Sequence, residues 1–323
     1  MKEPGGPLGR TNAWKIVKND KKTGLFHAYL VLSRDEKYLR DILKRFAKLI
    51  LCGEDGCGNC RVCRLIDGEN YADAVFLPAN GDKILTEDVN ALIEDSYVKP
   101  LEGDKKLYVV VGAQNMPAAA QNKLLKTLEE PPKNVVILMG ATNAYALLPT
   151  VRSRVKTLEI PPFTAEEIET ALADTCRDRE KLALAAACGD GTVGRAEDLY
   201  QDARLEKLFD LTAEIVVKMK SSRDVLKYAN LVLKEKDRLG DIFNIASALF
   251  RDMLAEKQGA KAADAHALKK VRAATGFNVG SLVSALEKTE EAVRRLSFNA
   301  NETMLAEWWL FAILEGKHKW QRS

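Results

Sequence analysis

Apolar and polar residues alternate in blocks along the first half of the chain. Short apolar runs of strand length stand at residues 25–32, 107–111 and 135–139, and each is typical of a buried β-strand. Apolar residues recur at helical spacing over residues 88–96 and 118–130. Strands that alternate with helices predict a parallel sheet covered by helices on both faces.

The pattern changes after residue 162. The strand signal stops there, and Thr164 and Glu167 have the spacing of a capping box that opens a helix. Amphipathic stretches then continue to the end of the chain, with a glycine-rich break near residue 190. We therefore predict an α/β plus α fold. Its expected parts are a flexible leader at 1–13, an α/β domain at 14–162, a small helical domain at 163–206 and a helical bundle at 207–323.

Composition and charge exclude some classes of protein. Apolar residues make up 46% of the 323 residues, but no apolar run approaches the roughly 20 residues of a membrane helix. The N-terminus lacks the apolar core of a secretory signal, so we expect a cytoplasmic protein with no membrane partner. The net charge is +3, from 49 basic and 46 acidic residues. This balance does not indicate nucleic-acid binding, so any DNA contact would be a local patch.

Four of the six cysteines lie within residues 52–63. They are Cys52, Cys57, Cys60 and Cys63, separated by four, two and two residues. Four thiolates can close a tetrahedral shell around Zn²⁺, and two-residue gaps let the backbone turn around the metal. A closed shell leaves no position for water, so the spacing predicts structural zinc. Free or redox-active thiols are the alternative.

The segment after the first predicted strand lies where P-loop NTPases bind phosphate. Their Gly-x4-Gly-Lys-Ser/Thr motif surrounds the phosphate with backbone amides. Here the segment has no glycine, and Asp35 adds negative charge. The second strand is followed by Gly-Ala-Gln at 112–114, without the acidic pair that organises Mg²⁺. We expect no ATP in this site. The degenerate positions are Ser33, Glu36, Leu39 and Arg40.

Residues 120–132 read Ala-Gln-Asn-Lys-Leu-Leu-Lys-Thr-Leu-Glu-Glu-Pro-Pro, an amphipathic helix stopped by two prolines. This segment closely resembles the signature helix of bacterial DNA polymerase III clamp-loader subunits, which are AAA+ proteins. Residues 26–30 and the cysteine cluster are similar to the first strand and zinc module of that family. The resemblance runs from about Trp14 to the C-terminus, and it is strong as far as residue 162.

Two arginines take expected roles from this resemblance. Residues 148–155 resemble the family's Ser-Arg-Cys motif, with Val155 in place of cysteine. By that resemblance Arg154 is an arginine finger that acts on the nucleotide of a neighbouring subunit, whereas a surface ion pair is the alternative. Arg195 lies in a segment similar to sensor 2, and without a P-loop we expect it to be structural.

The resemblance implies a non-ATPase δ′-type subunit, which is not an enzyme by itself. Its implied partners are γ/τ and δ subunits, primer-template DNA and, indirectly, the sliding clamp. Lys123 and Lys126 are candidate DNA contacts, and Trp308, Trp309 and Phe311 are expected to be exposed at subunit interfaces. Two other functions stay open. One is an ATP-binding γ/τ-type motor subunit, and the other is a zinc-knuckle nucleic-acid-binding protein outside the family.

Overall fold

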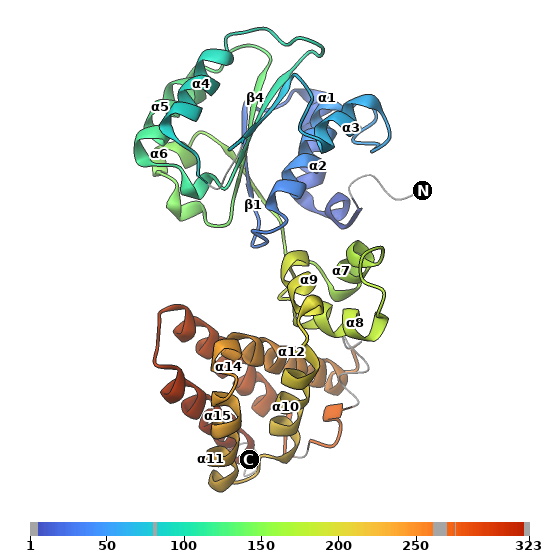
Figure 1. Ribbon diagram of the computed structural model, residues 1–323, viewed down its shortest axis with the longest axis vertical. Helices are drawn as coiled ribbons and strands as arrows, with labels where there is room; N and C mark the ends of the chain where they lie inside the picture. The colour runs from blue at the N-terminus through green and yellow to red at the C-terminus, as the bar shows by residue number, and fades with distance from the viewer. Residues whose placement is uncertain (1–5, 80–82, 261–269, 275, 320–323) are drawn as a thin grey trace. The chain divides into compact units, whose positions relative to one another are not determined.

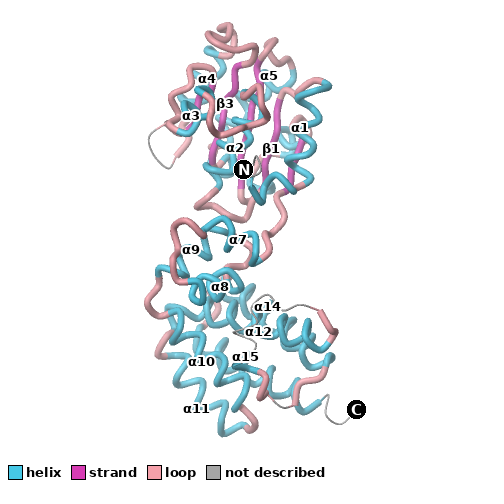
Figure 2. Tube along the Cα trace, turned by 90° about the vertical axis from the view of Figure 1, so that its right-hand side faces the viewer, coloured by secondary structure: helices cyan, strands magenta, loops and turns pink. Residues whose placement is uncertain are grey.

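The computed structural model describes residues 6–79, 83–260, 270–274 and 276–319. The chain divides into two compact units, Met1–Pro162 and Phe163–Ser323. The first contains a β-sheet with helices, and the described part of the second is helical (Figures 1 and 2). Each unit has its own hydrophobic core. The four-part division predicted from the sequence stays a prediction within these two units.

The first unit is built on a five-stranded parallel sheet, which confirms the predicted fold class. Helices α1, α2 and α3 cover one face, and α4, α5 and α6 cover the other (Figure 1). Burial on both faces explains why the central strands read as continuous apolar runs. The strand order is β2 (Ala74–Leu77), β3 (Lys106–Val111), β4 (Val135–Ala141), β1 (Ala28–Leu32) and β5 (Lys156–Glu159).

The three predicted strands are confirmed, but β2 and β5 were not predicted. Each has only four residues, and three of the four in β5 are not buried, so neither gives a long apolar run. The helices after the strands are also present, with shifted starts. They are α2 (Leu39–Leu51), α3 (Arg61–Asp67), α4 (Thr86–Asp95), α5 (Ala118–Glu129) and α6 (Pro149–Arg152).

The N-terminal segment differs from the expected leader. Residues 1–5 lie outside the described part of the chain, but a 3-10 helix covers Gly6–Arg10 and α1 covers Asn12–Thr23. Leu8 and Ala13 are buried, and the rings of Trp14 and Phe46 lie 5.6 Å apart between α1 and α2. The expectation of a flexible leader is therefore wrong from residue 6 onward, because this segment contributes to the core.

The described part of the second unit is formed by helices. The predicted capping box is confirmed, since the backbone N–H of Thr164 donates to Glu167 at 2.9 Å and that of Glu167 donates to the Thr164 hydroxyl at 3.2 Å. One hydrophobic core joins residues from α8 through α15. The helices are α7 (Ala165–Leu172), α8 (Arg179–Cys188), α9 (Val193–Gln201), α10 (Leu205–Lys218), α11 (Ser222–Leu233), α12 (Leu239–Lys257), α14 (Val279–Ser297) and α15 (Glu302–Lys319).

The aromatic residues of α15 do not all face outward. Phe311 is 39% exposed, as expected. Trp308 is partly buried, and the Arg295 guanidinium lies 4.2 Å from its ring. Trp309 is fully buried, and its indole N–H donates to the Thr289 hydroxyl at 3.0 Å. The expectation that Trp309 is exposed is wrong, because this helix is apolar on the side that packs into the bundle as well as at Phe311.

Membrane insertion finds no support in the helices. Within the described ranges, none of them combines the length and the apolar character that a membrane span needs.

Candidate functional site

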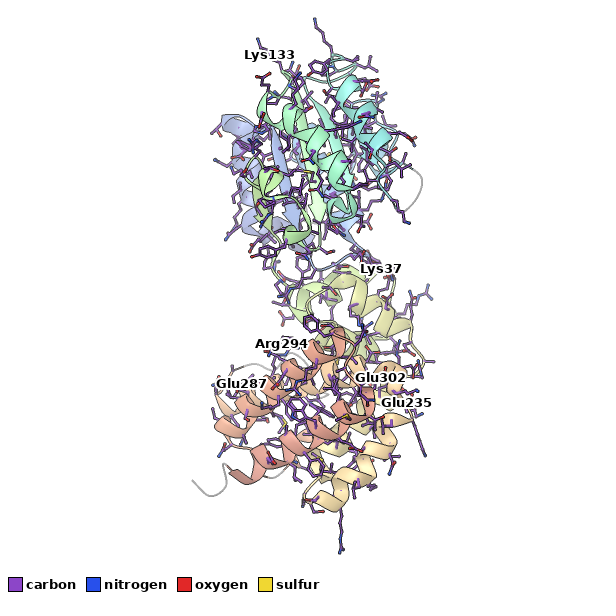
Figure 3. All side chains as sticks on the ribbon, turned by 90° about the vertical axis from the view of Figure 1, so that its left-hand side faces the viewer. Lys37, Lys133, Glu235, Glu287, Arg294 and Glu302 are labelled. Carbon is purple, nitrogen blue, oxygen red and sulfur yellow. The ribbon has the colours of Figure 1, made fainter. Side chains whose placement is uncertain are left out.

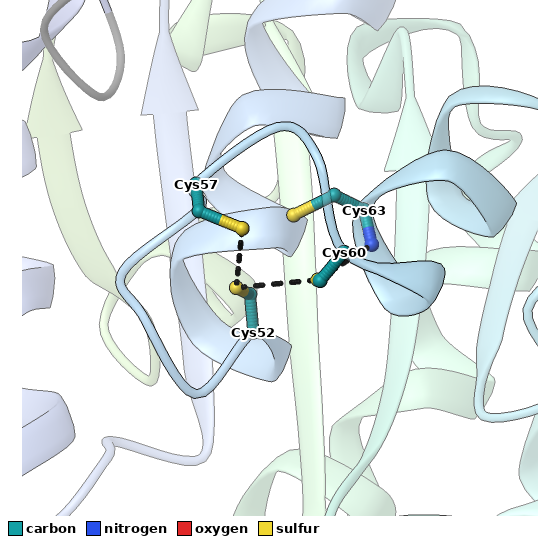
Figure 4. Close-up of side chains that lie close together, drawn as sticks. All are labelled: Cys52, Cys57, Cys60 and Cys63. Carbon is teal, nitrogen blue, oxygen red and sulfur yellow. Dashed lines mark hydrogen bonds between the residues drawn. The ribbon is translucent and has the colours of Figure 1, made fainter. Parts of the chain in front are cut away.

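The four cysteines converge in space. Cys52 ends α2, Cys60 caps the N-terminus of α3, and Cys63 lies in the first turn of α3. The sulfur of Cys52 lies 3.7 Å from that of Cys57 and 3.6 Å from that of Cys60 (Figure 4). All four sulfurs lie within 4.8 Å of one another. A tetrahedral shell with Zn–S bonds of about 2.3 Å separates its sulfurs by about 3.8 Å, so this arrangement fits a metal ion.

The electrostatics of the cluster also favour a cation. Burial opposes ionisation of Cys52, but backbone N–H groups of Cys57, Glu54 and Gly56 lower the pKa of its thiol to about 6. Burial and the neighbouring cysteine sulfurs instead raise the pKa of the Cys63 thiol. Several thiolates are therefore costly together without a compensating charge. A divalent ion supplies that charge and lets every ligand deprotonate.

The turn that carries Cys57 needs glycine. Gly56 and Gly58 have φ angles of 83° and 80°, which side chains rarely adopt. A Cβ atom at Gly56 would lie 3.4 Å from the backbone nitrogen of Leu49. The close approach of this turn to the end of α2 therefore brings Cys57 toward Cys52.

Ion pairs hold the module on one side to α1. Lys21 donates to the carbonyl of Cys52 and lies 3.3 Å from the Asp55 carboxylate. Lys18 lies 3.2 Å from the same carboxylate, and the two lysines lower the pKa of Asp55 despite its partial burial. These contacts fix the backbone immediately after the first cysteine ligand.

A second anchor connects α3 to the loop before β3. Arg61 donates to both carboxylate oxygens of Glu102, at 2.5 and 3.2 Å. The loop is itself held by the buried carboxylate of Asp73, which accepts from the backbone N–H groups of Leu101, Glu102 and Gly103 at 2.6, 2.8 and 2.8 Å. The sequence analysis did not find Asp73, because its partners lie nearly thirty residues away.

The segment between β1 and α2 has no room for a phosphate. Ser33 and Asp35 are buried. The Ser33 hydroxyl accepts from the backbone N–H of Asp35 at 3.2 Å, and the Asp35 carboxylate accepts from that of Tyr38 at 3.1 Å. A carboxylate thus takes a backbone donor at the helix N-terminus, where a P-loop would present donors to phosphate.

The other degenerate positions are placed as follows. Leu39 is buried, and Glu36 is exposed. Arg40 donates to the Glu69 carboxylate at 2.6 Å and to the carbonyl of Pro78 at 2.8 Å, so its guanidinium points to contacts within the unit. The structure therefore supplies internal partners where an ATPase would bind its nucleotide. Helix α2 begins six residues later than the Ser33–Glu36 spacing suggested, because Asp35 forms a turn before it.

Polar side chains at the neighbouring strand ends also have internal partners. The Gln114 side chain accepts from the backbone N–H of Thr142 at 3.2 Å, which ties the end of β3 to that of β4. Asn143, in the segment that resembles sensor 1, accepts from the backbone N–H of Tyr145 at 2.9 Å. Both side chains therefore stabilise local backbone at this edge of the sheet.

Arg154 follows α6 and is partly exposed. Its Nη2 lies 2.5 Å from the Glu129 carboxylate, and its Nη1 donates to the Thr150 carbonyl at 2.9 Å and the Ser153 hydroxyl at 3.2 Å. The carbonyl of Arg154 also accepts from the His27 ring at 3.1 Å when that nitrogen carries the proton. The backbone of Arg154 is thus held in place, while its guanidinium reaches the surface.

The remaining candidates are ordinary surface or structural residues in this structure. Arg195 forms an ion pair with Asp241, a buried carboxylate that Arg238 also contacts at 2.8 Å. Lys123 donates to Asn90 at 2.9 Å, and Lys126 is exposed. Figure 3 shows Lys37 and Lys133 projecting from the surface in the same way. DNA contact by these lysines and a sensor role for Arg195 stay predictions.

Comparison with known proteins gives relatives of one kind. Residues 9–164 match the model of a protein family described as DNA polymerase III, delta subunit. DNA polymerase III subunit delta' of Bacillus subtilis is 34% identical over 164 residues, which is 50% of each chain. The subunit of the same name from Haemophilus influenzae is 33% identical over 189 residues, 56% of this chain and 57% of that one. The chain thus matches about half the length of these curated relatives.

Subunits with other names match as well. The tau/gamma subunit of Haemophilus influenzae is 30% identical over 157 residues, 47% of this chain and 23% of that protein. Among solved structures, a gamma subunit-related protein of Thermotoga maritima aligns over 95% of this chain and all of that one, at 17% identity. Its TM-score is 0.45, so no argument rests on that alignment.

Together, the parallel sheet, the cysteine module and these relatives define an AAA+ protein of the clamp-loader class. Through residues 9–164, the chain belongs to the family described as DNA polymerase III, delta subunit.

Proposed function

We propose that this chain is a δ′-type subunit of a bacterial DNA polymerase III clamp loader, which acts in the cytoplasm without hydrolysing ATP itself. In this role it joins γ/τ and δ subunits in a ring and helps them place the sliding clamp on primer-template DNA. The observation that carries the proposal is a contrast within one unit. The phosphate-site segment is filled by Ser33 and Asp35, whereas Arg154 reaches the surface on a fixed backbone.

Arg154 is the residue that would act on a neighbour. A guanidinium supplied across a subunit interface stabilises the negative charge that develops on the transferred phosphoryl group. Such a residue needs no phosphate-binding loop in its own chain. The loss of the loop and the presence of Arg154 are therefore compatible when catalysis is shared between subunits.

Cys52, Cys57, Cys60 and Cys63 would hold one Zn²⁺ as a structural ion. The ion would neutralise the clustered thiolates and fix the turn between α2 and α3. Lys21 and Arg61 attach that turn to α1 and to the loop at residues 101–103. We propose no catalytic role for the metal, because four protein ligands complete a tetrahedral shell.

A γ/τ-type motor subunit is the main alternative, since relatives named tau/gamma also match. The two proposals differ in nucleotide binding. Equilibrium binding of labelled ATP to the isolated chain separates them, and we expect no saturable binding at submillimolar ATP. Submillimolar affinity would favour the motor subunit.

Reconstitution with the γ/τ and δ subunits of the same organism tests the proposed role of Arg154. We expect Arg154→Ala to leave assembly intact and to lower DNA-stimulated ATP hydrolysis, because turnover at the site it serves falls on the order of 10³-fold. The total rate falls only in part if other subunits carry fingers of their own. Arg154→Lys should rescue poorly, since lysine lacks the planar fork.

Lys133→Ala is a matched control for this measurement, since it removes an exposed cation from the same unit. Its rate should equal that of the unmodified complex. An unchanged rate for Arg154→Ala at equal assembly would reduce Arg154 to a structural residue.

A further inference from the structure

The Arg154 guanidinium lies in an ion pair that a partner's phosphate would have to replace. We propose that Glu129 is a positioning residue that holds Arg154 in a resting position, so that Arg154 acts in trans only after its side chain leaves this carboxylate. This inference rests on the proposed role of Arg154 as an arginine finger. It concerns the chain's own contact at residues 129 and 154, which lie on two different helical segments of the first unit.

The contacts of the guanidinium carry the argument. Nη2 lies 2.5 Å from an oxygen of Glu129, while Nη1 donates to the Thr150 carbonyl at 2.9 Å and the Ser153 hydroxyl at 3.2 Å. Both terminal nitrogens are therefore engaged within the chain. A phosphate that meets the fork of the guanidinium uses the same two nitrogens. The phosphate and Glu129 thus compete for Nη2.

The surrounding backbone allows the side chain to move alone. The backbone N–H of Arg154 donates to the carbonyl of Val151 at 3.0 Å, and its carbonyl accepts from His27. Glu129 lies in the last turn of α5, before the two prolines that end the helix. Because both backbones are fixed, release of the ion pair needs only rotation of the Arg154 and Glu129 side chains.

The exposure of the pair makes it reversible. The side chains of Arg154 and Glu129 are 34% and 50% exposed, and ion pairs exposed to this extent are weak. A nucleotide phosphate carries more negative charge than one carboxylate, so it can displace Glu129 once a subunit interface brings it close. Before that contact, the carboxylate keeps the guanidinium occupied. The pair would suppress hydrolysis in complexes whose interfaces have not closed.

Glu129→Gln tests the inference in the reconstituted complex, because it removes the charge and preserves the shape of the side chain. We expect ATP hydrolysis without DNA to rise about two- to fivefold, the range that corresponds to one exposed ion pair. The DNA-stimulated rate should change less, since Arg154 is then already released. Raising the salt concentration should reduce the difference between the variant and the unmodified complex, because salt screens an exposed pair.

Glu130→Gln is the matched control. Glu130 is the adjacent residue, is exposed, and makes no ion pair among the described residues. It loses the same charge, and its rate should not change. The double variant Glu129→Gln plus Arg154→Ala should hydrolyse ATP at the rate of Arg154→Ala alone, because a contact acting through Arg154 has no effect without it.

The outcomes separate this inference from the function on which it rests. If Arg154→Ala lowers hydrolysis but Glu129→Gln leaves the DNA-free rate unchanged or lowers it, the resting position is refuted and the finger remains. A rise that persists in the Arg154→Ala background, or that Glu130→Gln reproduces, also refutes it. If Arg154→Ala has no effect, the finger and the resting position fail together.

Discussion

Helix α2 carries a different arrangement at each of its ends. At the N-terminal end, Asp35 accepts from the backbone N–H of Tyr38, so a side chain of the chain itself takes the place of a ligand. At the C-terminal end, Cys52 contributes one of four sulfurs that converge on a single point. The first end has closed a site that its fold class uses for phosphate, whereas the second presents a complete set of metal ligands. The same fold therefore gains or loses a site through a few side chains.

The largest expected effect comes from breaking the C-terminal site. Cys57→Ser plus Cys60→Ser should lower the zinc content from about one ion per chain to nearly none, because two hydroxyls replace two thiolates. Amide hydrogen exchange should become faster in residues 52–67 but not in the central strands, which have their own core. Elemental analysis and exchange mass spectrometry measure the two effects.

The control for the zinc measurement is Cys176→Ala, which removes a buried cysteine outside the cluster. This variant should keep its zinc. Full zinc occupancy in the double serine variant, or metal-free protein purified without chelator, would contradict the metal site.

A smaller effect is expected at Asp73, which fixes the loop that meets the cysteine module. Burial opposes ionisation, but three backbone N–H groups bring the pKa of Asp73 below its ordinary value. Asp73→Asn should lower the free energy of unfolding by about 1–3 kcal/mol at neutral pH, because it removes a buried charged acceptor.

The pH dependence gives this prediction a sign. A carboxyl whose pKa is lower in the folded state stabilises the protein above its unfolded pKa, about 3.9, and this stabilisation is lost as the pH falls through the folded value. Urea unfolding should therefore show a difference between the unmodified chain and Asp73→Asn that narrows as the pH falls below about 4. Asp104→Asn, at an exposed position in the same loop, should show no such difference. A gap that does not change with pH would assign the effect to packing.

The smallest effect is expected at the N-terminal end of α2. Asp35→Ala should lower the free energy of unfolding by about 1–2 kcal/mol, because it removes a buried acceptor from a backbone donor. Glu36→Ala, at the adjacent exposed position, should change it far less. Urea unfolding compares the two variants. If Asp35→Ala were as stable as Glu36→Ala, the turn before α2 would not depend on this carboxylate.

Some features of the molecule were predictable because they depend on residues close together in the sequence. The cysteine cluster was found from spacings of two and four residues, which restrict how far apart the sulfurs can lie. Residues 120–132 placed Leu124 and Leu128 in the core and Lys123 and Lys126 at the surface, as the structure confirms. The central strands were found from apolar runs, because a strand buried on both faces has few polar residues.

Other features depend on partners that only the tertiary structure brings together. The short strands β2 and β5 take their pairing from longer neighbours, and four residues are too few to show a period. Asp73 acquires its role from residues 101–103, and Arg61 from Glu102. Trp309 was expected at the surface, but packing against α12 and α14 places it in the core.

Arg154 shows where the two kinds of information meet. Its candidacy came from the residues around it in the sequence, whereas its contact with Glu129 joins positions 25 residues apart. Local sequence determined which chemical groups the chain carries and how they are spaced along a helix, strand or turn. Packing decided which of these groups meet, because a hydrogen bond or an ion pair depends on a few ångströms between segments that the sequence separates.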